Sequence, residues 1–317
     1  MVRLLTILLM VFLANAALAG VTDAKKQRDA GVIDAALIGD TDALKVMLEQ
    51  GASPGAVNEF GKSAMMFAAE AGNADVVEML IAAGADVNAR SMAGCTALTY
   101  ASESGDPALV KFLLARGAKT YPKTRAGWDA LAVATRQGYL DIIAILIANG
   151  ANVNTSDKDG TTALMAAAEK NNIRAAQMLL AADADLHVRN KDGMSAMMIA
   201  ACAGHTDAVK HLLDVGANVN ALDNDGANAL FCAAEGNHVG TMQLLLGKGA
   251  DINHQNIVGE TALISAVHTG ASNAVQLLLK GGADVGIRDK RGYSAVQYAK
   301  RKRNKEIAHL LEKTSAK

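Results

Sequence analysis

The sequence has 317 residues, of which 51% are hydrophobic and 20% are charged, so it can bury a large core. Its 31 lysines and arginines are balanced by 32 aspartates and glutamates, which argues against a nucleic-acid partner. Aromatic residues make up only 3%, which favours thin helical layers spaced by alanine.

Residues 1–19 have the three parts of a secretory signal peptide. Arg3 supplies the positive start, residues 4–13 form the apolar run, and the Ala-Leu-Ala of residues 17–19 supplies the cleavage site, so we predict cleavage before Gly20. The alternative, an uncleaved anchor helix, would need a longer apolar run. The sequence therefore predicts a periplasmic or secreted protein that is not inserted in a membrane after cleavage.

Residues 20–57 precede the regular part of the chain. Residues 20–29 are polar and are predicted to form a short flexible lead. Residues 30–57 keep part of the spacing seen later and are predicted to form a degenerate N-terminal capping repeat, because the outer face of a terminal repeat has no neighbour to pack against.

From residue 58 onward a glycine returns every 33 residues, and we call it the marker glycine. The eight marker glycines are Gly61, Gly94, Gly127, Gly160, Gly193, Gly226, Gly259 and Gly292, and alanine stands three and seven residues after each of them. A period of this length is typical of stacked structural units. We predict seven full repeats over residues 58–288 and a C-terminal capping repeat over residues 289–317.

Each repeat carries the signals for a hairpin turn and two short helices. Small polar residues that favour turns precede the marker glycine, and two residues after it stands a favoured helix N-cap. The predicted N-caps are Ser63, Thr96, Asp129, Thr162, Ser195, Asn228, Thr261 and Ser294. The first helix should end at a glycine such as Gly72, and the second should bury apolar residues at helical spacing, such as Val76 and Leu80.

This pattern resembles the ankyrin repeat family over about residues 24–317. The family's Thr-Pro-Leu-His box appears as Ser-Ala-Met-Met at residues 63–66 and Thr-Ala-Leu-Met at residues 162–165, with alanine always in place of proline and no histidine kept. The family's closing Gly-Ala-Asp-Val-Asn stands at residues 84–88. The resemblance implies an all-α solenoid of helix-turn-helix units with projecting β-hairpin loops and about nine repeats, including the end caps.

The resemblance also implies that a monomeric chain binds a partner protein through the hairpin tips and the exposed face of the first helices. By resemblance the contacting positions are the two residues before the marker glycine, the one after it, and the ninth and tenth after it. Tryptophan and arginine, which are enriched in binding hot spots, gather in the first full repeats. The predicted partner-binding residues are Phe60, Met92, Arg125, Trp128, Arg136 and Lys158. The alternative for Trp128 is that it folds onto residues 121–122 and shields its own loop.

The three cysteines have no framework spacing. Cys202 and Cys232 lie nine and six residues after their marker glycines, one helical turn out of step, so we expect them to be too far apart to bond and to fill the core. Cys95 follows its marker glycine directly and is expected to be the exposed thiol.

The sequence contains no zinc-protease, nucleophile-elbow or phosphate-loop signature, and its seven histidines are scattered. We therefore expect no enzyme activity, no cofactor and no bound metal. Met194, Met197 and Met198 have the spacing of a site for monovalent copper, but Met197 and Met198, like Met65 and Met66, fall where the family places its buried box, which favours core packing.

These observations predict a non-enzymatic protein-binding scaffold outside the cytoplasm. Exported members of the family look like accessory proteins, so the scaffold is expected to inhibit, protect or assist an exported enzyme. Two alternatives stay open: a small-ligand or copper carrier that uses the methionine cluster, and a secreted effector that acts on a host protein.

Overall fold

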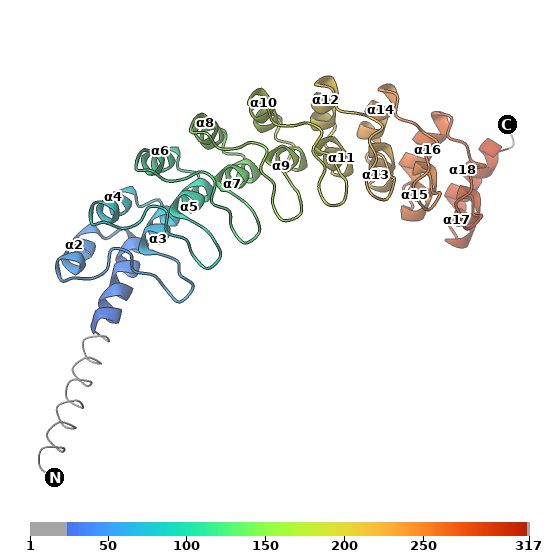
Figure 1. The fold of residues 1–317 in the computed structure, drawn as a ribbon. Helices are drawn as coiled ribbons and strands as arrows, with labels where there is room; N and C mark the ends of the chain where they lie inside the picture. Colours follow the sequence, from blue (N-terminus) through green and yellow to red (C-terminus); the bar gives the residue numbers. More distant parts are fainter. Residues whose placement is uncertain (1–23, 316–317) are drawn as a thin grey trace, which may run out of the picture. The chain divides into compact units, whose positions relative to one another are not determined.

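The structure, a computed structural model, describes residues 24–315 (Figure 1). The predicted signal peptide and its cleavage point lie outside the described residues. The chain divides into two compact units, Met1–Ala151 and Asn152–Lys317, and each is described by itself.

Both units are built from short helices. In the first unit, residues 24–38 are helical, and they are followed by α2 (Thr41–Glu49), α3 (Ala64–Ala71), α4 (Ala74–Ala82), α5 (Ala97–Ser104), α6 (Pro107–Ala115), α7 (Ala130–Gln137) and α8 (Leu140–Ala148). The second unit contains α9 (Ala163–Glu169), α10 (Ile173–Ala181), α11 (Ala196–Cys202), α12 (Thr206–Asp214), α13 (Ala229–Glu235), α14 (Val239–Gly247), α15 (Ala262–Thr269), α16 (Ser272–Lys280), α17 (Ala295–Arg301) and α18 (Lys305–Ser315). The first of these helices begins inside residues 20–29, where we expected a flexible lead.

The helices of each unit form two layers. We call the first helix of a repeat the inner helix and the second the outer helix. In the first unit, the inner helix α5 packs between α3 and α7, and in the second unit α13 packs between α11 and α15. Figure 1 shows the connecting loops projecting on the side of the inner helices. Isolated antiparallel bridges such as Val57↔Ser63 and Arg288↔Ser294 close these loops, so the predicted all-α fold with hairpin loops is confirmed.

The local signals read from the sequence decide where the inner helices start and stop. All eight predicted residues are the N-caps of the inner helices. The usual histidine of the box is missing, but in two repeats the sulfur of the methionine at that place, Met66 or Met165, accepts a 3.5 Å hydrogen bond from the N-cap backbone N–H. Gly72 ends α3 with φ +77°, as predicted, and Asn171 adopts the same left-handed conformation where its repeat has no glycine.

Alanine sets the spacing between neighbouring inner helices. The alanines three and seven residues after the marker glycines are buried in every repeat, and the second set is fully buried. Valine and leucine of the outer helices, such as Val77 and Leu80 of α4, complete the core of each layer. Small side chains on the inner helices therefore allow close approach, while larger ones on the outer helices fill the remaining volume.

The expectation for Cys202 and Cys232 was wrong, because the two residues form a disulfide bond between α11 and α13. Their Cα atoms are 4.9 Å apart, within the range that a disulfide spans. The reason is a stagger between neighbouring inner helices, which places the ninth residue after one marker glycine beside the sixth residue after the next. The rings of His268 and Tyr298, which occupy the same two positions, have centroids 4.1 Å apart.

Asparagines of the closing motif connect neighbouring repeats. The Asn88 side-chain amide donates a 3.0 Å hydrogen bond to the carbonyl oxygen of Gly117 and accepts one of 2.9 Å from the N–H of Lys119. Asn154 and Asn220 make the same pair of bonds to the repeats that follow them. The loops after the outer helices thus supply hydrogen bonds between neighbouring repeats.

Candidate functional site

The exposed side of the inner helices in the first unit presents a regular array of side chains. Three positions in each repeat contribute to it: the first, sixth and ninth residues after the marker glycine. We call this array the inner face, and it consists of Lys62, Phe67, Glu70, Cys95, Tyr100, Glu103, Trp128, Val133 and Arg136. The first position lies at the base of the hairpin loop, and the other two lie on the inner helix.

An aromatic cage surrounds Lys62 at one end of the inner face. The Nζ atom of Lys62 lies 4.2 Å from the ring centroids of both Phe67 and Tyr100, and it forms an ion pair with Glu70. Only 14% of the Lys62 side chain is exposed, so its charge is already satisfied. Burial, followed by the nearby Cys95 thiol and Glu70 carboxylate, raises the pKa of Tyr100 to about 12.

At the other end of the inner face, Trp128 and Arg136 stack on each other. The guanidinium carbon of Arg136 lies 4.1 Å from the centroid of the indole, in a cation–π contact. The hydroxyl of Thr124 accepts a 3.1 Å hydrogen bond from the Trp128 backbone N–H, and the Thr124 backbone N–H donates to the Trp128 carbonyl at 2.8 Å. These bonds fix the backbone at the base of the hairpin loop, and Arg136 of α7 contacts the indole.

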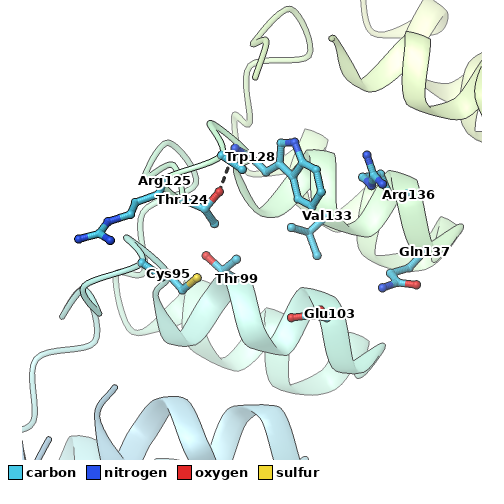
Figure 2. Close-up of a pocket in the computed structure, with 11 residues that line it drawn as sticks. Cys95, Thr99, Glu103, Thr124, Arg125, Trp128, Val133, Arg136 and Gln137 are labelled. Atoms are coloured by element: carbon cyan, nitrogen blue, oxygen red, sulfur yellow. Dashed lines mark hydrogen bonds between the residues drawn. The ribbon is translucent and has the colours of Figure 1, made fainter. Parts of the chain in front are cut away.

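A pocket of about 300 Å³ lies beside this stack, between α5 and α7. Figure 2 shows the indole of Trp128 next to Val133, with Cys95 and Thr99 across the pocket. Apolar groups make up most of the lining, and the charged side chains of Glu103, Arg125 and Arg136 stand around it. This combination of an apolar cavity with a few polar groups is typical of a recognition site.

The structure brings together three of the six predicted partner-binding residues, Arg125, Trp128 and Arg136, at this pocket. Phe60 and Met92 are 63% and 60% exposed on the two preceding hairpin tips, which are joined by a hydrogen bond from the Met92 N–H to the Phe60 carbonyl. Lys158 is exposed and belongs to the second unit.

Trp128 is half-buried, lies against Arg136 and lines the pocket. Tyr121 is 66% exposed, with the Nζ of Lys119 5.7 Å from its ring centroid.

Phe67 and Tyr100 were missed as members of the site. They lie in helices among alanines that are the same in every repeat, and this made them resemble core residues. The available signal was that the sixth position differs from repeat to repeat, whereas the third and seventh are always alanine. Where the residue type varies between otherwise similar repeats, the repeat fold does not determine which side chain stands there.

Two of the three methionines considered for copper are core residues, and Met194 is half-buried. Met197 and Met198 are each 1% exposed, in α11, so their thioethers contribute to packing. Among the described residues, no group of three or more histidines, cysteines, aspartates or glutamates is placed to hold a metal ion.

A family model for ankyrin repeats, described as three copies, matches residues 32–124, 120–190, 175–256 and 239–317. Together these matches cover far more than half of the chain. The chain belongs to the ankyrin repeat family. Ankyrin repeats are typically protein–protein interaction modules without enzyme activity, which agrees with the inner face described above. No curated protein matches the sequence.

The last ankyrin repeats of the second unit carry an aromatic cluster at the same positions. Arg301 stacks on Tyr293 with 4.7 Å between the guanidinium carbon and the ring centroid, as Arg136 does on Trp128. The Tyr298 hydroxyl donates a hydrogen bond to Asp289.

None of the helices in the described ankyrin repeats has the length and apolar character needed to cross a membrane.

The Tyr298–Asp289 pair of these ankyrin repeats predicts a loss of stability at high pH. Its hydrogen bond, together with burial, raises the pKa of Tyr298 to about 12. The interactions that raise this pKa contribute to the unfolding free energy. Their contribution is complete at pH values below the pKa of an unfolded tyrosine, about 10, and it is lost as the pH rises through about 12. Urea unfolding at increasing alkaline pH should therefore show declining stability.

The matched variant for this measurement is Tyr298→Phe. It removes the ionisable group while keeping the ring against His268, so its stability should decline less over the same pH interval. In a pH titration followed by tyrosinate absorbance, the folded variant should also lack one tyrosine that ionises with a pKa of about 12 in wild type. An unchanged absorbance titration would show that Tyr298 is not the group that ionises late.

Proposed function

We propose that this ankyrin repeat protein is a non-enzymatic scaffold that binds a partner protein through the inner face and hairpin tips of its first unit. The observation that carries the proposal is the half-buried stack of Trp128 on Arg136 beside an apolar pocket. Tryptophan and arginine dominate binding hot spots when they border a pocket that a partner can desolvate.

We further propose that the protein acts outside the cytoplasm. The signal peptide predicted over residues 1–19 supports this location. The Cys202–Cys232 disulfide gives independent support, because such bonds persist in oxidising compartments and are rare in the cytosol. In that compartment the scaffold would inhibit, protect or assist an exported enzyme. The buried positions of Met197 and Met198 argue against the copper-carrier alternative.

The test is affinity capture from the compartment that contains the native protein, with wild type and Trp128→Ala compared under the same conditions. We expect the substitution to weaken the partner's affinity by about 2 kcal/mol, or roughly thirtyfold, because it removes the aromatic wall and the stacking surface of Arg136. The melting midpoint and helical content should change little, because Trp128 is only half-buried and is not part of the core.

Tyr121→Ala is the matched control for this comparison. Tyr121 lies in the same hairpin loop and is an exposed aromatic residue outside the pocket, so its loss should leave capture nearly unchanged. Equal capture by wild type and Trp128→Ala would remove the pocket from the binding site. A large fall in the melting midpoint of Trp128→Ala would instead assign the indole a role in stability.

A further inference from the structure

We propose that the pocket beside Trp128 receives one large apolar side chain of the partner, and that a carboxylate next to that side chain binds the basic hairpin tip above the pocket. We define the basic tip as Arg90, Lys123 and Arg125. This inference rests on the proposed protein-binding function and specifies the chemistry of the partner at that site.

The shape and lining of the pocket suit an apolar side chain. Its volume of about 300 Å³ is at the lower end of the range of small-ligand pockets, which is enough for a leucine, methionine or aromatic side chain. Its floor includes Val133, which is 8% exposed, and its rim includes Ala93 and Ala126. These groups offer dispersion contacts and few hydrogen bonds. An apolar side chain should therefore bind in the pocket more favourably than a polar one.

The charges around the pocket are unevenly distributed, and this orients the partner. Residues 119–128, which form the hairpin loop, contain three basic residues and no acidic one. The Arg90 side chain donates a 2.5 Å hydrogen bond to the Lys123 carbonyl, which holds its guanidinium next to the tip. The acidic residue of the pocket, Glu103, lies on α5. A partner carboxylate is therefore attracted to the tip and repelled from the α5 side.

The two arginines of the pocket have different roles in this arrangement. Arg136 is stacked on the indole and stabilises the wall of the pocket. Arg125 is exposed, and Figure 2 shows its side chain directed away from the indole, on the other side of Thr124. Its backbone N–H donates a 2.7 Å hydrogen bond to the Ala93 carbonyl, which ties the two tips that flank the pocket. Arg125 is therefore the cation best placed to meet a carboxylate outside the pocket.

A library of displayed random peptides tests the proposal without knowledge of the natural partner. Peptides are selected on the immobilised wild-type protein and counter-selected on Ala126→Phe, in which an added ring at the rim fills the pocket. We expect the surviving peptides to share a large apolar residue with an aspartate or glutamate within one or two positions. Circular dichroism of Ala126→Phe verifies that the blocked variant is folded.

Trp128 provides a direct readout for the selected peptide, because it is the only tryptophan of the chain. A synthetic peptide of the selected sequence should change the emission of Trp128. It should also slow alkylation of Cys95, which is the free thiol and lines the pocket. Arg125→Glu should weaken binding about tenfold or more, and Arg125→Lys should weaken it less.

Lys191→Glu is the control for charge. Lys191 stands at the equivalent tip position, two residues before its marker glycine, but it does not line the pocket, so reversing its charge should change affinity by less than about twofold. Selected peptides without an adjacent apolar and acidic residue, or peptides that also bind Ala126→Phe, would overturn the proposed chemistry. The capture experiment tests protein binding separately. Failure of the peptide selection would therefore contradict only the proposed chemistry of the partner, whereas equal capture by wild type and Trp128→Ala would contradict the pocket as the binding site.

Discussion

Replacement of both Cys202 and Cys232 by alanine should lower the unfolding free energy of the second unit by about 3–4 kcal/mol. The disulfide joins residues separated by 30 positions, and in the chain-entropy description it removes the freedom of that loop from the unfolded state. It also connects two neighbouring inner helices, α11 and α13, so its loss weakens one interface of the stack. Urea unfolding of the oxidised wild type and of the double variant measures the difference.

Two controls separate the bond from the side chains. A reducing agent should destabilise wild type by a similar amount and leave the double variant unchanged. Cys95→Ala, which removes the free thiol, should have little effect in either condition. Denatured but unreduced wild type should show one reactive thiol. Three reactive thiols, or equal stability of wild type and the double variant under oxidising conditions, would contradict the disulfide.

Gly259→Ala should destabilise the second unit by about 2–4 kcal/mol, from two separate causes. Gly259 has φ +85°, a left-handed conformation that costs an L-residue about 1–2 kcal/mol. A Cβ atom added there would also lie 2.8 Å from the backbone nitrogen of Lys290 on the next hairpin tip. That nitrogen donates a 3.0 Å hydrogen bond to the carbonyl of Val258, which would have to lengthen or break.

Gly292→Ala is the matched control, because Gly292 is the marker glycine of the last repeat. It has nearly the same conformation, φ +84°, but a Cβ atom added there meets nothing within 4 Å. It should therefore lose only the conformational part, about 1–2 kcal/mol. The difference between the two variants in urea unfolding measures the packing between neighbouring tips. Equal losses would show that the marker glycines are required only for their backbone conformation.

The repeat period, the limits of the inner helices and the family could all be predicted from the sequence, because they depend on signals within one repeat. A side-chain N-cap such as Ser63, a left-handed glycine such as Gly72 and the alanine spacing act over three to seven residues. The same local information placed Trp128 and Arg136 on one repeat, eight residues apart, where the loop base meets the helix.

The relations between repeats were decided only by the tertiary structure. The stagger of neighbouring inner helices sets the ninth residue of one repeat beside the sixth of the next, and the sequence alone led us to compare equivalent positions instead. This stagger joins Cys202 to Cys232 and brings the Glu70 carboxylate close to Tyr100, whose pKa is raised mainly by burial and further by Cys95 and Glu70. A repeating sequence thus determines its own unit, whereas the packing of one helix on the next determines which residues of different units form the site.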